Sequence, residues 1–476
     1  MVINKVIICP ICGKKTYLRI QNGGYLNEYP IRINCINCRA LLKGRFVMGG
    51  TKKQLGLTMI NADIEECDFN YSSPENNDLQ SYVVRNADYV AEVSGELPCK
   101  CVSEYNGGIP LSPFMSTLDK IDSMNERIMR LKYFANNMYE WQRTKSTAFQ
   151  LLDEGSIDYI AVALNNRMGK YKYECDHYLK SLHCLQEVVL DETKYLFVEP
   201  KQDDCIRELL IQLATIDKSN IHSFCKEIGG SAELLFSYRK VIEVFSSFLR
   251  IYPNVLPAET YMYLTNKEHA NTGIATCTFA DIKDFYQDAY ESLLSLMFLP
   301  VCFDNITTRG DFQAFDKEYN YVRCKQKVRD VHWYRSLDNG TRFNKLNTNE
   351  LFQNIIAFTG NRYLRNGIGH NNISYNGISQ MVTSYDLKDP NKITAETTLM
   401  DMAIDCIGMA KTSVILSEMI LFLLREEFRK DHITTITHPR YYKNIGPNEK
   451  CPCGSSIKYK KCCKPEIDDI LLVEDK

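Results

Sequence analysis

The stretch Asn361-Arg-Tyr-Leu-Arg-Asn-Gly-Ile-Gly-His-Asn-Asn372 brings an arginine, a polar neighbour and a histidine together with two glycines. It follows residues 349–359, whose apolar side chains recur at roughly helical spacing. The sequence therefore predicts a buried helix over 349–359 that ends or changes course at this stretch. We expect Arg365, Asn366 and His370 to form the chemical centre of the chain.

The bulk composition is that of a soluble globular protein. The chain has 476 residues, 45% hydrophobic and 24% charged, and this length predicts several folded units rather than one core. The N-terminus lacks the layout of a secretory signal. The apolar stretch 413–424 contains Glu418 and is too short to span a bilayer. We therefore expect a cytoplasmic protein without membrane contact.

Eight of the 19 cysteines fall into two clusters with the spacing of metal ligands. The first cluster has two C-x-x-C turns, the pattern of a zinc ribbon, with a redox dithiol pair as the alternative. The second has four thiols within thirteen residues near the C-terminus. We expect one structural Zn²⁺ in each cluster and no catalytic metal. The expected ligands are Cys9, Cys12, Cys35 and Cys38 in the first cluster, and Cys451, Cys453, Cys462 and Cys463 in the second.

Charge is distributed unevenly along the chain, although the net charge is −2. Residues 1–50 hold eight Lys and Arg against one acid, and residues 439–464 hold seven against one. The remainder is therefore acidic. Basic ends on an acidic body predict contacts with phosphate, as in RNA, or with an acidic partner. The alternative is that these are solvated lysines around the metal sites.

Periodicity predicts β-structure in the first quarter of the chain and helices in most of the rest. The fold class is mainly α and multidomain. The predicted strands are 16–20, 30–34, 57–60, 81–85 and 89–93, with a hairpin formed by 380–385 and 392–398. The predicted helices are 118–143, 146–165, 173–188, 204–216, 221–228, 231–251, 279–303 and 401–429, with a break at 254–272. The predicted domains are a zinc ribbon (1–50), a β-rich extension (51–115), a helical connector (116–272), a helical domain with a small β insertion (273–433), a zinc knuckle (439–465) and an acidic tail (466–476).

The C-terminal cluster resembles the SEC-C motif, a small zinc-binding module. The matching residues are Ile445-Gly, Asn448, Cys451-Pro-Cys-Gly-Ser455 and Lys458-Tyr-Lys-Lys-Cys-Cys463, with a departure at Ser456-Ile457. In that family the module is an interaction device. The resemblance implies that the four cysteines bind zinc and that the lysines between them face a protein partner or RNA.

The segment Arg365-Asn-Gly-Ile-Gly-His370 resembles the signature of the HEPN superfamily of ribonucleases. The resemblance implies a HEPN-like helical bundle over 273–433, and an endoribonuclease that cuts tRNA or mRNA through attack of the 2′-hydroxyl. It also implies a homodimer, and a role as a toxin or anti-phage abortive-infection effector. Because residues five apart on a helix do not share a face, we expect Gly367 and Gly369 to interrupt the helix so that the arginine and histidine converge.

Two alternatives to catalysis stay open. The glycines and basic residues of 365–370 are also typical of a helix C-terminus, where a glycine caps the helix and cations lie near the last carbonyls. The second alternative is a non-catalytic, zinc-dependent adaptor that binds RNA or protein on a catalytically inactive, HEPN-like scaffold.

Overall fold

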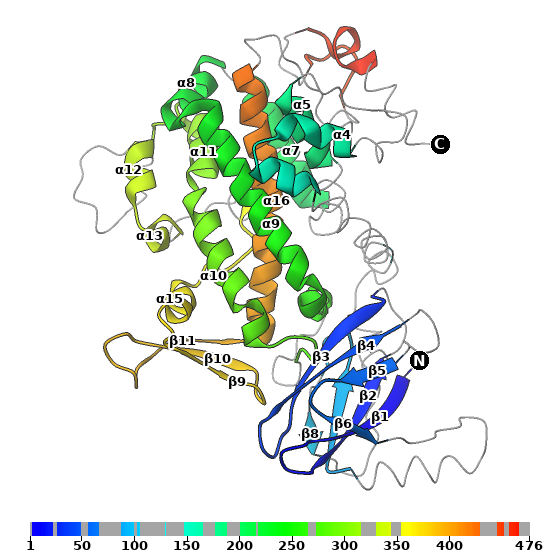
Figure 1. The fold of residues 1–476 in the computed structure, drawn as a ribbon. Coiled ribbons are helices and arrows are strands. Elements are labelled where there is room, and N and C mark those ends of the chain that lie inside the picture. The colour runs from blue at the N-terminus through cyan, green and yellow to red at the C-terminus, as the bar shows by residue number, and fades with distance from the viewer. Residues whose placement is uncertain are drawn as a thin grey trace. The chain divides into compact units, whose positions relative to one another are not determined.

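The computed structural model comprises two compact units, each assembled from segments far apart in the sequence (Figure 1). The first unit contains Met1–Asn136, Ser247–Asp288 and Asn361–Ile407, and the second contains Asn137–Ser246, Ala289–Gly360 and Gly408–Lys476. The structure describes residues 2–21, 26–48, 56–65, 87–99, 102–104, 129, 147–164, 177–187, 200–215, 218–264, 273–315, 330–343, 354–428, 445–451 and 457–465. The predicted strand 81–85, most of the predicted helix 118–143, and the acidic tail lie outside these residues.

The first unit begins with two β-sheets. The larger has the order β6-β1-β2-β7-β8, in which β1 and β2 form an antiparallel hairpin and β7 lies parallel to β2. The smaller is antiparallel, with the order β3-β4-β5. The strands are β1 (Val2–Ile8), β2 (Lys15–Gln21), β3 (Glu28–Asn34), β4 (Leu41–Val47), β5 (Gly56–Met59), β6 (Asp63–Glu65), β7 (Tyr89–Val93) and β8 (Ser103–Glu104).

These sheets combine the predicted zinc ribbon with the predicted β-rich extension. Strands from residues 1–50 pair with strands from 56–104 in both sheets. The predicted strands at 16–20, 30–34, 57–60 and 89–93 are confirmed. Alternation at β4 places Leu42 and Phe46 in the core, where the Phe46 ring lies 5.5 Å from that of Tyr29. The N-terminal part is therefore β-rich, and the fold is mixed rather than mainly α.

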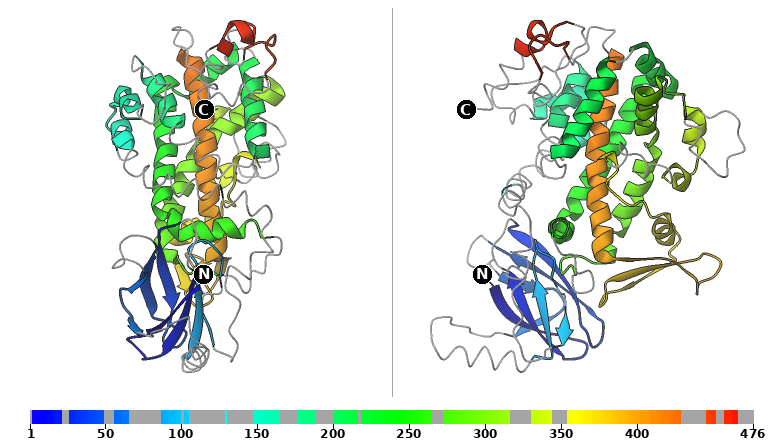
Figure 2. Two further views of the ribbon diagram at one scale, coloured as in Figure 1. Left: turned by 90° about the vertical axis from the view of Figure 1, so that its right-hand side faces the viewer. Right: turned by 180° about the vertical axis from the view of Figure 1, so that it is seen from behind.

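The rest of the first unit is a small sheet with helical segments. An antiparallel sheet of order β11-β10-β9 is formed by β9 (Ile373–Asn376), β10 (Met381–Tyr385) and β11 (Ile393–Thr398). The predicted hairpin is confirmed as β10 and β11, whereas β9 was not predicted. Helix α15 (Arg362–Gly369) packs against this sheet (Figure 1 and Figure 2).

The second unit is helical. Its core contains Phe303, whose ring lies 6.3 Å from that of Phe224 and 6.1 Å from that of Phe422. The helices that lie wholly within this unit include, among the described residues, α4 (Ile160–Leu164), α5 (Tyr178–Leu185), α7 (Pro200–Thr215), α8 (Lys218–Ile228), α11 (Phe298–Arg309), α12 (Val331–Ser336) and α13 (Asn339–Phe343). Three longer helices contribute to both units: α9 (Gly230–Tyr261), α10 (Phe279–Ser295) and α16 (Leu399–Phe428).

Among the differences between the predicted and the observed helices, three have a clear physical cause. Helix α9 continues through Pro253 and Pro257 into the predicted break, because its apolar residues there, such as Val255, are fully buried and packing outweighs local propensity. The predicted helix 279–303 is two helices, and Pro300 lies in the first turn of the second, where its missing N–H is tolerated. The predicted helix 146–165 is broken at Gly155, whose φ is +79°.

Among the described helices, α16 alone is long and apolar enough to cross a membrane. The most apolar 18-residue stretch of this helix is entirely buried within the structure. The stretch 413–424, which is itself too short to span a bilayer, is therefore part of a helix that is long enough to do so, but the prediction that it forms a buried core helix is confirmed.

Candidate functional site

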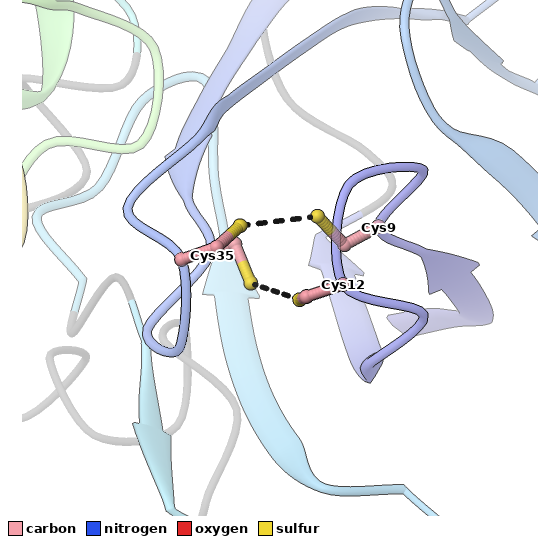
Figure 3. A group of neighbouring side chains, drawn as sticks. Cys9, Cys12 and Cys35 are labelled. Atoms are coloured by element: carbon pink, nitrogen blue, oxygen red, sulfur yellow. Dashed lines mark hydrogen bonds between the residues drawn. The ribbon is translucent and has the colours of Figure 1, made fainter.

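Four cysteine side chains from two turns of the first unit converge at one point (Figure 3). The Sγ atom of Cys9 lies 3.5 Å from that of Cys38, and the Sγ atom of Cys12 lies 3.6 Å from that of Cys35. All four sulfurs lie within 4.8 Å of one another. Zn–S bonds of about 2.3 Å in a tetrahedron separate the sulfurs by about 3.8 Å. The cluster therefore fits a structural zinc site, as predicted.

The two cysteine turns repeat the same backbone geometry. In the first, the N–H of Gly13 donates to the carbonyl of Cys9 at 2.9 Å, and in the second the N–H of Arg39 donates to the carbonyl of Cys35 at 2.8 Å. The donor residue is left-handed in both turns, with φ of +70° and +63°. Only the first turn has the glycine that this conformation favours.

The thiols of the two turns differ in pKa. The backbone N–H of Lys14 lowers the pKa of Cys12 to about 6, whereas burial raises the pKa of Cys35 to about 12. Without a cation the buried thiol would stay protonated at neutral pH. A coordinating metal ion deprotonates such a thiol outright, so the donor set is suited to Zn²⁺.

The C-terminal cysteines form the second cluster. The ligand atoms of Cys451, Cys462 and Cys463 lie within 4.8 Å of one another. A short β-bridge between Lys450 and Lys458 brings the two parts of the motif together. The fourth predicted ligand, Cys453, lies outside the described residues. This cluster fits a second structural zinc site.

The positive charge of residues 1–50 is largely paired within the first unit. Five of its eight basic side chains form ion pairs, and four of the five acids come from beyond residue 50. The pairs are Lys14–Asp88 at 2.7 Å, Lys15–Glu65 at 2.9 Å, Arg19–Glu92 at 3.3 Å, Arg45–Glu28 at 3.2 Å and Arg32–Asp281 at 3.5 Å. Much of this charge therefore contributes to the fold of the unit itself.

The Arg–Asn–His stretch forms a short helix of its own, α15. The predicted helix over 349–359 is wrong in its second half: of residues 354–360, only 354 and 355 are helical. Gly360 then adopts a φ of +65°, and a Cβ atom there would overlap the ring of Phe343. Asn361 starts α15 by accepting hydrogen bonds from the N–H groups of Tyr363 and Leu364 at 3.0 and 3.2 Å. Sequence reasoning missed this N-cap, although an asparagine before a helix is a usable signal.

The three predicted site residues lie on α15 or at its end. Arg365 is half-buried, and one of its guanidinium NH groups donates to the side-chain oxygen of Asn366 at 3.1 Å. Asn366 and His370 are exposed, and His370 is the C-cap. The structure thus joins Arg365 to Asn366 and places His370 one turn beyond Asn366.

The predicted interruption of the helix at Gly367 and Gly369 is wrong. The helix continues through both glycines to residue 369. The physical role of Gly367 is close approach: a Cβ atom there would overlap the hydroxyl of Ser384 on β10 and lie 3.3 Å from the carbonyl of Asn372. No local signal reveals this contact, because its partner lies on another element.

The helix ends at Gly369, with His370 as its C-cap and Asn371 directly after it. Asn371 is left-handed, with φ of +52°. Its N–H donates to the carbonyl of Ile368 at 3.1 Å, and the N–H of Asn372 donates to the carbonyl of Gly367 at 2.8 Å. This pair of bonds is the Schellman motif with asparagine at the left-handed position. The capping alternative was therefore right that a cap is present, but the left-handed residue of the cap is Asn371 and not a glycine.

Comparison with known proteins identifies one region of the chain. A family model of the SEC-C motif matches residues 448–465, which include Cys451, Cys462 and Cys463. SEC-C is a zinc-binding motif, in agreement with the geometry of the second cluster. No curated protein and no solved structure matches the chain significantly.

Proposed function

We propose that the chain is a metal-independent endoribonuclease of the HEPN type whose active centre is α15. The observation that carries the proposal is the hydrogen bond between Arg365 and Asn366, with the exposed His370 at the end of the same helix. This set of side chains has the residue types and order of the HEPN signature.

The proposed reaction cleaves RNA with its own 2′-hydroxyl. His370 takes the proton of that hydroxyl, or gives a proton to the leaving 5′-oxygen, since an imidazole can do either near neutral pH, and water carries out the other of the two proton transfers. The bond from phosphorus to the 2′-oxygen forms as the bond to the 5′-oxygen breaks. The guanidinium of Arg365, held by Asn366, stabilises the negative charge that develops on the phosphate oxygens. The products are a 2′,3′-cyclic phosphate and a free 5′-hydroxyl.

A homodimer would complete this site. On a continuous helix, residues five apart differ by about 140° around the axis, so Arg365 and His370 of one copy point in different directions. Two copies of α15 facing each other would offer one scissile phosphate an arginine from one and a histidine from the other. In this arrangement the arginine and the histidine converge between two copies, whereas the glycines were expected to let them converge within one chain.

The remaining parts fit recruitment and regulation. The C-terminal zinc module is proposed to contact RNA or a protein partner through Lys458, Lys460 and Lys461, whose side chains are exposed. We further propose that the protein acts in the cytoplasm as a toxin or abortive-infection effector that cuts tRNA or mRNA. The resemblance at residues 365–370 is the support for that role.

The test is cleavage of total RNA by purified protein in a buffer without divalent ions. Arg365→Ala and His370→Ala should each abolish cleavage. Imidazole in the buffer should partly restore the histidine variant, because it can replace the missing proton carrier. Arg45→Ala and His332→Ala serve as matched controls, since both side chains are more than half exposed and lie on other elements. Both controls should cleave like the native chain.

Zinc content must be measured in the same reactions, because a chelator used to remove divalent ions from the buffer can also remove zinc from the structural sites. RNA left intact by a folded, zinc-loaded dimer would contradict catalysis. If that protein bound RNA equally well with and without the two substitutions, the non-catalytic adaptor would be the better description.

A further inference from the structure

The solvent face of α15 carries two residues of the signature, Asn366 and His370, together with residues outside it. Leu364, Gly367 and Ile368 form the buried face. At 100° per residue, the exposed positions of the helix fall within an arc of about 120°. The exposed residues are Arg362, Tyr363, Asn366, Gly369 and His370.

Tyr363 is a large aromatic side chain that the fold leaves in solvent. It is 44% exposed. The guanidinium carbon of Arg362 lies 4.8 Å from the ring centroid, and the same guanidinium donates to the tyrosine hydroxyl at 2.9 Å. The carbonyl of Tyr363 accepts a hydrogen bond from the hydroxyl of Ser384 at 2.9 Å. The ring is therefore exposed while its backbone is fixed to β10.

The surroundings of this ring are positively charged. The hydrogen bond from Arg362 lowers the pKa of Tyr363, and the charge of Lys392 on the turn between β10 and β11 lowers it further. Lys388 on the same turn is also exposed. Lys392 lies 4.0 Å from Asp386, at the limit of an ion pair, so its charge remains available to a ligand in solvent.

We propose that Tyr363 stacks on an unpaired base of a single-stranded RNA substrate, with Arg362 and Lys392 contacting the adjoining phosphates. Aromatic rings flanked by cations bind single-stranded nucleic acid in this way. Tyr363 and His370 are seven residues apart, which is about 10 Å along the helix and about 20° around it. A strand lying along α15 would therefore place its stacked base about one or two nucleotides from His370. Because a base inside a duplex does not expose its face, the substrate class is unpaired RNA.

This inference rests on the proposed function for its meaning, but RNA binding can be measured without cleavage. His370→Ala protein provides the cleavage-blocked parent. The probe is a short single-stranded RNA containing 2-aminopurine, whose fluorescence falls when it stacks on an aromatic ring. Into this parent we would introduce Tyr363→Ala, Tyr363→Phe and Tyr363→Trp. Tyr159→Ala is the matched control, because that tyrosine is 65% exposed and lies in the second unit.

The expected result is a loss of affinity of about tenfold for Tyr363→Ala, together with loss of quenching. Phenylalanine and tryptophan should keep both, and the control should match the parent. Lys392→Ala should weaken binding and reduce the dependence of affinity on salt. A double-stranded probe of the same sequence should bind no differently to the Tyr363→Ala variant and the parent.

Four results would overturn the inference. The first is a parent that does not bind the single-stranded probe, and the second is equal binding and quenching by the parent and the Tyr363→Ala variant. The third is loss of binding with phenylalanine as well as with alanine, and the fourth is a changed oligomeric state of the Tyr363→Ala variant with unchanged affinity. Cleavage by the native chain separates the two proposals. If the chain cleaves RNA and Tyr363 has no effect, this inference alone fails. If it binds through Tyr363 but never cleaves, the ribonuclease proposal alone fails.

Discussion

Substitution of Gly367 by alanine tests how α15 is held on its sheet. The structure places this position so close to β10 that an added Cβ atom would overlap the Ser384 hydroxyl and lie 3.1 Å from the Ser384 Cβ. Ser384 would have to move, and its hydrogen bond to the carbonyl of Tyr363 would be lost or lengthened. Gly367→Ala should therefore loosen the attachment of α15 to the sheet.

Two opposing effects set the size of this change. Replacing glycine by alanine inside a helix stabilises by about 0.5–1 kcal/mol. Overpacking a buried contact costs about 1–3 kcal/mol, and loss of the hydrogen bond adds about 1 kcal/mol. The steric effect is larger, so we expect net local destabilisation of about 1–3 kcal/mol.

Backbone hydrogen exchange, read by mass spectrometry over residues 362–385, measures this local stability directly. A loss of about 1–3 kcal/mol corresponds to exchange that is about 5 to 150 times faster. Gly369→Ala is the matched control on the same helix. Its Cβ atom would meet nothing closer than 3.8 Å, at the amide of Gln287, so its exchange should be unchanged or slower.

Equal protection in the Gly367→Ala and Gly369→Ala variants would refute the close approach of α15 to β10. The double variant Gly367→Ala/Ser384→Ala sharpens the test, because removing the hydroxyl makes room for the new methyl group. The double variant should then be less destabilised than the sum of the two single variants. Strict additivity would mean that the two side chains do not meet.

Three further predictions concern the metal sites and the left-handed residues. Native protein should contain about two zinc ions per chain by elemental analysis, and the Cys35→Ser variant should contain about one. The Cys225→Ser control removes a buried thiol outside both clusters and should keep about two. Gly13 has φ of +70° with open space around it, so Gly13→Ala should lower the free energy of unfolding, measured by thermal denaturation, by about 1–2 kcal/mol. Arg39→Gly at the equivalent position should leave this free energy unchanged or raise it. In the Asn371→Gly variant, α15 should be protected from hydrogen exchange as well as in the native chain. In the Asn371→Ala variant, the free energy of local opening of α15 should fall by about 1 kcal/mol.

The features that the sequence predicted well are those determined by neighbours in the chain. Ligand spacing identified the first cysteine cluster, because each C-x-x-C turn positions its own two sulfurs. The hairpin of β10 and β11 was predictable because alternation and the intervening turn lie within twenty residues. In both cases the physical cause of the structure is local.

The features that it predicted poorly depend on distant partners. Strand β7 pairs in parallel with β2, and nothing near residue 89 specifies that partner. Helix α9 continues through two prolines because its buried face has partners elsewhere in the fold. Gly367 was taken for a helix breaker, since its true contact, Ser384, lies 17 positions further along the chain. The division into two units was also not predicted, because each unit gathers three segments that are separated by 42 to 110 residues of the other unit.

The cap of α15 bears directly on the catalytic test. The bonds that end the helix join backbone N–H groups to backbone carbonyls, and the left-handed position belongs to Asn371. None of them requires the imidazole of His370 or the amide of Asn366. His370→Ala therefore removes the proposed proton carrier while leaving the cap intact. Loss of RNA cleavage with native hydrogen exchange in α15 would separate catalysis from capping, which the residues 365–370 alone could not do.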